Sequence, residues 1–264
     1  MAVSNAWVVS ATVPNGGMGN GLSEANASGL TDSNRMKQLA FNVLQILKWP
    51  VAVISLLCLP AIALSCWNLV SSEVMNSNGV FWIVAVVSTI LGWVMCTRFR
   101  VTRFLTTMEH EFIHVLLAWA TGLRVYSLKA ESDGSGLAMI ETPFNWLVAL
   151  GPYFIPFALY LYALLGLGMG IEGTAAEAFF GMIFGYEMVA NIRESHPHQT
   201  DFQIAGKAFT LCFLPTAMLL SYGGAFAFLA SGELSASWSF MMETSSQAFF
   251  DTWNWIEEFV RHQL

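Results

Sequence analysis

His110 and His114 stand four residues apart, with Glu111 between them, in the run His110-Glu111-Phe112-Ile113-His114. In an α-helix, residues i and i+4 share one face, so both imidazoles can bind the same metal ion. Zinc held there would lower the pKa of a coordinated water to about 7, and Glu111 would accept its proton as the general base. The pattern therefore predicts metal-assisted hydrolysis.

The motif lies near the middle of an apolar stretch, residues 104–121. Titratable side chains inside a membrane span are costly, so by default they indicate a functional site. The simpler alternative is that His110 and His114 are hydrogen-bonded residues of a helical bundle and Glu111 is one more polar neighbour. We favour the metal site, because the spacing and the apolar surroundings agree.

The composition indicates a membrane protein. Of the 264 residues, 55% are hydrophobic and only 11% are charged, which is too little charge for the surface of a soluble domain of this size. The net charge of -7 includes no basic run that could follow a phosphate backbone, so nucleic acid is not an expected partner. We expect a multi-pass integral membrane protein whose surroundings are the lipid bilayer.

Six apolar stretches approach the roughly 20 residues that a helix needs to cross the hydrocarbon core. They are residues 49–70, 80–97, 104–121, 144–167, 175–192 and 208–230. Residues 123–142 alternate polar and apolar around a Gly-containing turn, which predicts a β-hairpin. The predicted fold class is an all-α membrane bundle of about six segments, with a small β-hairpin after the metal-binding helix.

Four regions follow from these patterns. Residues 1–34, rich in Gly, Ser and Asn, predict a disordered tail, and residues 35–103 hold two spans. Residues 104–232 form the core around the motif, and residues 233–264 form a tail with an amphipathic helix. That helix would lie at the membrane interface, against a regulatory partner protein, or on the bundle as a cap.

Basic residues lie before the first predicted span and after the second. They are Arg35, Lys37, Lys48, Arg98, Arg100 and Arg103. Loops on the cytoplasmic side of a membrane carry an excess of Lys and Arg. Two crossings separate the two groups, so both of them, and the N-terminus, are expected on the cytoplasmic side.

Around the motif the chain resembles the site-2 protease family of intramembrane zinc metallopeptidases. The resemblance covers residues 103–206 and rests on the H-E-x-x-H helix, the hairpin, a span with a Gly-Pro pair and a later Asp. It implies that His110 and His114 are zinc ligands and that Glu111 is the catalytic residue.

The Gly-Pro element of the family matches Gly151-Pro152 in this chain. The resemblance implies that these two residues help to position the substrate. The Asn that usually follows the element in the family is replaced here by Phe154 and Ile155.

The third zinc ligand has several candidates. The resemblance implies a late Asp, and Asp201 is the nearest match. His196 and His198, just before it, are alternative ligands. If every segment after the motif crosses the membrane completely, Asp201 emerges on the wrong face, and Glu177 becomes the ligand on the correct side. We favour Asp201, with residues 175–192 crossing incompletely.

The predicted function is a Zn²⁺-dependent peptidase that cuts a membrane protein or membrane-proximal peptide. The hairpin would offer an edge strand for an extended substrate, because a helical substrate must unwind before its carbonyls are accessible. The main alternative is a non-catalytic membrane scaffold or transporter that uses the same polar interior for binding. A di-iron oxidase is disfavoured, because the five histidines are fewer than such sites need.

Overall fold

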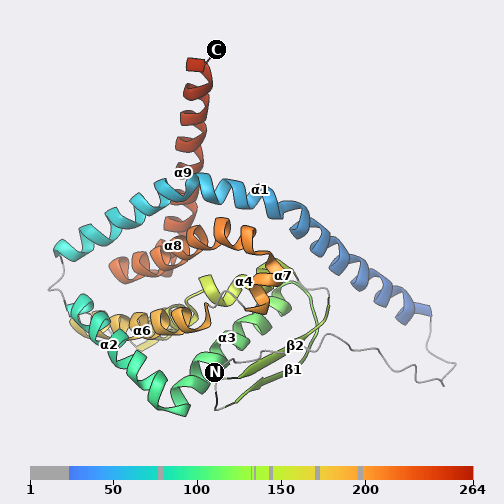
Figure 1. The fold of residues 1–264 in the computed structure, drawn as a ribbon, viewed down its shortest axis with the longest axis horizontal. Coiled ribbons are helices and arrows are strands. Elements are labelled where there is room, and N and C mark those ends of the chain that lie inside the picture. The colour runs from blue at the N-terminus through green and yellow to red at the C-terminus, as the bar shows by residue number, and fades with distance from the viewer. Residues whose placement is uncertain are drawn as a thin grey trace.

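The computed structural model describes residues 24–76, 80–131, 133, 135–142, 145–169, 173–195 and 199–263. The elements in order are α1 (Glu24–Asn76), α2 (Val80–Arg98), α3 (Arg100–Ala120), β1 (Val125–Ala130), β2 (Gly136–Ile140), α4 (Trp146–Phe154), α5 (Phe157–Met169), α6 (Gly173–Glu194), α7 (Thr200–Ala205), α8 (Lys207–Ser231) and α9 (Leu234–Gln263). Figure 1 shows the helices gathered around the short α4 and α7, with the strands at one side. The mostly helical fold with one hairpin after the motif helix is confirmed.

Helices α1 and α8 are the two in the described residues that are long and apolar enough to cross a membrane on their own. Their candidate spans are Arg35–Ser72 and Lys207–Ser231. The helices pack against each other (Figure 1). At this contact the Thr216 hydroxyl donates a hydrogen bond of 2.8 Å to the Ser55 carbonyl. Both predicted spans are therefore found as apolar helices, and they are joined by a hydrogen bond between two buried residues.

Two broken helix pairs are further candidate spans. Helices α2 and α3 meet at 107°, and α4 and α5 meet at 65° at Ile155 and Pro156. If each pair counts as one span, the described residues hold up to four candidates. The predicted count of about six is therefore not confirmed. Helix α6, for which we expected an incomplete crossing, is not among the candidates; it carries Glu177 and Glu187.

The predicted hairpin is present. Gly122, with φ of 75°, turns the chain out of α3 and into β1. Strands β1 and β2 pair antiparallel. The β2 residues Ala138 and Ile140 are buried in a cluster with Val115 of α3 and Val148 of α4. The hairpin is thus held against the motif helix by apolar contacts.

Helix α1 is tied to the hairpin and to α4. Lys37 Nζ lies 2.7 Å from Glu141 Oε2, and the backbone N–H of Arg124 donates to the same oxygen at 3.0 Å. Burial acts to raise the pKa of Glu141, but the contacts with Lys37 and Arg124 outweigh it and lower the pKa. The indole of Trp146 donates to the Leu44 carbonyl at 2.8 Å. The first half of α1 therefore contacts both the hairpin and α4, the two elements that pack against the motif helix.

The two ends of the chain differ in part from the predicted tails. Helix α1 already begins at Glu24, inside the region assigned to a disordered tail, and residues 1–23 lie outside the described residues. Helix α9 is longer than predicted. Its first half packs on α8 and α1, which fits a cap on the bundle, and its second half extends away from the other helices (Figure 1).

Candidate metal centre

Helix α3 turns one polar face inward. Its buried residues recur at helical spacing: Thr106, Thr107, His110, Glu111, Ile113, His114, Val115 and Ala118. The exposed fractions of His110, Glu111 and His114 are 9%, 4% and 1%. The predicted common face of the two histidines is confirmed, and burial this deep demands compensating partners for all three polar side chains.

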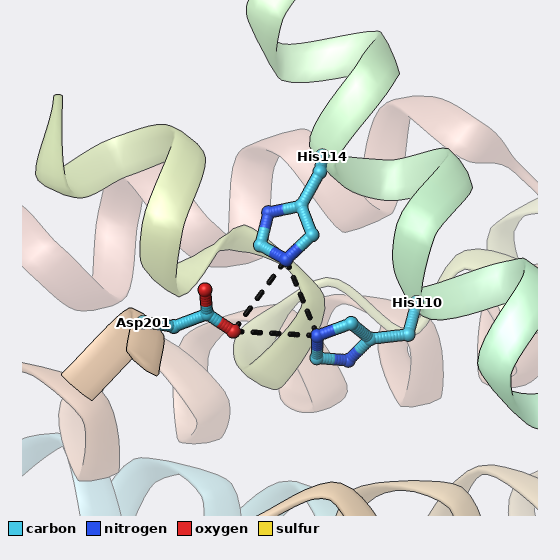
Figure 2. Close-up of side chains that lie close together, drawn as sticks. All are labelled: His110, His114 and Asp201. Atoms are coloured by element: carbon cyan, nitrogen blue, oxygen red, sulfur yellow. Dashed lines mark hydrogen bonds and ion pairs between the residues drawn. The ribbon is translucent and has the colours of Figure 1, made fainter. Parts of the chain in front are cut away.

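Asp201, from the short helix α7, meets the two histidines (Figure 2). The Nε2 atoms of His110 and His114 lie 3.2 Å apart, and Asp201 Oδ2 lies 3.4 and 3.5 Å from them. Three ligands of a tetrahedral zinc ion with bonds of about 2.0 Å stand about 3.3 Å apart. The donor set of two imidazoles and one carboxylate at these separations fits zinc.

The ring of His114 is oriented by α4. Its Nδ1 lies 2.8 Å from the Val148 carbonyl oxygen, and Asn145, the N-cap of α4, accepts a hydrogen bond from the Val148 N–H at 3.0 Å. A carbonyl can only accept, so Nδ1 must carry the proton. In the neutral imidazole, Nε2 then presents its lone pair to His110 and Asp201, as a metal ligand requires.

The electrostatics of Asp201 favour a positive charge between these side chains. Burial acts to raise the pKa of the carboxyl, but the charge of a protonated His114 and hydrogen bonds with His110 and His114 hold the pKa well below its usual range. Asp201 Oδ1 is buried and has no hydrogen-bond partner among the described residues. A bound cation would take the place of the imidazole protons beside an ionised carboxylate.

Glu111 lies on the same face of α3, against the start of β2. The backbone N–H of Ala138 donates to its carboxylate, while Oε2 has no hydrogen-bond partner among the described residues. A Cβ added at Gly136 would lie 2.7 Å from Glu111 Cγ and 2.5 Å from Thr107 Cγ2, so the hairpin can approach this closely only with glycine. Glu111 is thus fixed at one oxygen and free at the other.

The Gly-Pro element brings α4 against the motif helix. A Cβ added at Gly151 would lie 1.9 Å from Leu117 Cδ1 and 3.4 Å from Ile113 Cγ2, so a side chain here would require Leu117 or the packing of α3 on α4 to shift. Pro152 is buried in the same helix. Gly151 therefore supports the contact between His114 and the Val148 carbonyl, and a role of the element in positioning substrate stays a prediction.

The other candidate ligands are not found beside His110, His114 and Asp201 in the described residues. Glu177 lies on α6 and is not part of the ligand group formed by the described residues, whereas Asp201 is. His196 and His198 lie outside the described residues. Of the candidate third ligands in the described residues, Asp201 is the one whose carboxylate lies beside the two histidines, and its role as a ligand stays a prediction.

A second polar cluster beside the motif was not predicted. Glu109, which directly precedes His110, and Glu187 of α6 both accept from the Ala158 N–H, at 3.2 and 2.8 Å. The two carboxyl groups are also hydrogen-bonded to each other. The cluster joins α3, α5 and α6. The signal for it in the sequence was the presence of Glu109 and Glu187 within apolar stretches.

Comparisons with known proteins agree with the motif. Residues 80–194 match the model of a family described as Peptidase M50B-like. The match includes His110, Glu111 and His114 and ends before Asp201. No curated protein and no solved structure matches the chain. The resemblance to the site-2 protease family is confirmed over this part of the chain, and Asp201 lies beyond the matched residues.

Proposed function

We propose that this site-2 protease-like membrane protein is a zinc-dependent peptidase that cuts a peptide bond within or beside the bilayer. The observation that carries the proposal is the convergence of His110, His114 and Asp201 on one point, next to Glu111 on the same helix face. The family match and the candidate membrane spans support it.

The residues of the site divide the chemistry among them. Zinc, when bound by His110, His114 and Asp201, would supply a Lewis acid that polarises a carbonyl and makes water acidic. Glu111 would accept the proton of the attacking water through its free oxygen and deliver it to the leaving amine. The burial of these side chains excludes bulk water, which strengthens their electrostatic action.

An extended substrate would lie along the hairpin. Strand β2 pairs only with β1 in the described part of the chain, and its first residue contacts Glu111. A peptide added as a further strand would present its backbone carbonyls near the ligand atoms. We propose a membrane protein or a membrane-proximal peptide as the substrate.

Gly136→Ala tests this placement of Glu111. The added methyl group would overlap with Glu111 and Thr107, so Glu111 or the hairpin must shift. A displacement of about 1 Å in a catalytic group can cost about 100-fold in rate, and we expect a loss of this order in kcat. Zinc content should be unchanged, because Gly136 does not contact the ligands.

The matched control is Leu128→Ala, on the partner strand β1 with its side chain exposed. It should keep the wild-type kcat. A Gly136→Ala variant as active as the wild type would remove the hairpin from the proposed site.

Metal analysis separates the proposed function from its rivals. We expect one zinc per purified chain, loss of cleavage of a membrane-embedded peptide after chelation, and recovery on adding zinc. A metal-free chain without cleavage would favour the scaffold or transporter, and two irons per chain would favour the oxidase.

Two proposals about the surroundings accompany this function. The basic residues at the start of α1 support an N-terminus on the cytoplasmic side. The exposed aromatic residues Phe250, Trp253 and Trp255 on the second half of α9 support contact with a regulatory partner protein there.

A further inference from the structure

Tyr153 of α4 contacts Asp201 and His110 at once. Its hydroxyl donates a hydrogen bond of 2.8 Å to Asp201 Oδ2. Its ring meets the His110 ring edge to face, with centroids 5.1 Å apart, and its centroid lies 4.5 Å from that of the Phe202 ring. With 1% of its surface exposed, Tyr153 is among the most buried large residues of the described chain.

The oxygen that accepts from Tyr153 is the one that faces both imidazoles. Oδ2 lies 3.4 Å from His110 Nε2 and 3.5 Å from His114 Nε2, whereas Oδ1 has no hydrogen-bond partner among the described residues. The tyrosine hydroxyl thus donates to the carboxylate oxygen that points at the histidines.

Asp201 needs such an anchor because of where it lies. It belongs to α7, a helix of six residues, whereas both histidines lie on the 21-residue α3. The ligand atoms therefore come from two separate elements, and holding a ligand in one orientation before the metal arrives strengthens binding.

We propose that Tyr153 is the positioning residue of the metal centre, whose hydroxyl holds Asp201 Oδ2 toward the two histidines and thereby strengthens zinc binding. The inference rests on the proposed zinc site. Tyr153 directly follows the Gly-Pro element. Gly151 allows α4 to lie close to α3, and Tyr153 then reaches Asp201 on α7.

Tyr153→Phe is the direct test, because it removes the hydroxyl and keeps the ring that packs on His110 and Phe202. Zinc affinity of the full-length protein in detergent, measured by competition with a chelator of known affinity, should fall about 10- to 100-fold. The absorption spectrum of the Co²⁺-loaded protein should also change, since the carboxylate ligand is no longer held in one orientation.

Tyr160→Phe is the matched control. It removes a partly buried hydroxyl that donates to the Ser221 carbonyl at 2.8 Å, away from the metal centre. Zinc affinity and the Co²⁺ spectrum should both stay as in the wild type. If Tyr153 had only a structural role, Tyr153→Phe would lower thermal stability but would leave zinc affinity at the wild-type value.

A double variant checks that Tyr153 acts through Asp201. In an Asp201→Ala background, adding Tyr153→Phe should leave the weak remaining zinc affinity unchanged, because the hydroxyl no longer has a carboxylate to hold. Equal zinc affinity of the wild type and Tyr153→Phe would overturn the inference while leaving the zinc site intact. Absence of zinc binding in the wild type would overturn the proposed function itself.

Discussion

Replacing Glu111 by Gln is expected to leave one zinc per chain in place and to lower the rate of peptide-bond cleavage by about 100- to 10,000-fold. Gln keeps the shape of the side chain but cannot take a proton from water at neutral pH. The three ligand atoms of His110, His114 and Asp201 are untouched. The measurement is kcat for a membrane-embedded peptide, with zinc content determined on the same samples.

Glu131→Gln provides the same chemical change at an exposed position beside the hairpin turn and should leave kcat unchanged. Wild-type cleavage by Glu111→Gln would assign the proton transfer to another group. Loss of zinc in Glu111→Gln would instead make Glu111 a ligand.

The second large effect is expected from removing any one ligand. His110→Ala, His114→Ala and Asp201→Ala should each lose most of the bound zinc, because two remaining ligands hold zinc poorly in competition with water. Glu177→Ala should retain it, since Glu177 is outside the ligand group of the described residues. Elemental analysis after gel filtration measures the zinc in each variant.

The comparison between Asp201→Ala and Glu177→Ala decides the third ligand. Both changes remove one carboxylate, so they form a matched pair. Zinc retained in the Asp201 variant and lost in the Glu177 variant would reverse our assignment.

The part of the site that lies within one helix could be predicted from the sequence. His110, Glu111 and His114 owe their common face to helical periodicity alone, and the hairpin follows from alternation and a glycine turn. Both are local patterns, and both are confirmed. The apolar stretches likewise led to candidate membrane helices, because hydropathy is a property of composition.

Contacts between distant segments could not be predicted in this way. Tyr153 and Asp201 are separated by 48 positions, and their hydrogen bond depends on how α4 and α7 are placed in space. The number of crossings is hard to predict for a related reason: apolar length does not show whether a chain bends, as it does between α4 and α5. For the third ligand, the family resemblance pointed to Asp201. A topology in which every segment crosses the membrane completely would have pointed to Glu177.

Helix α1 is longer than a membrane crossing requires. Its candidate span has 38 residues, about 57 Å of helix, against a hydrocarbon core of about 30 Å. Even at a tilt of about 40°, the crossing would use only about 26 residues, so about a dozen must run along the headgroups. The charged end of the span, with Lys37, is the part that suits this position.

Lys37 forms an ion pair with Glu141 at the end of the hairpin, and the Leu44 carbonyl accepts a hydrogen bond from Trp146 at the start of α4. Both contacts lie in the part of α1 that exceeds the length of a crossing, rather than in the middle of the span. The hairpin and the start of α4 should then sit at headgroup level. A thicker bilayer draws more of α1 into the hydrocarbon, and shifts the hairpin relative to a substrate anchored by its own span. The position of the cleaved bond should therefore follow lipid chain length.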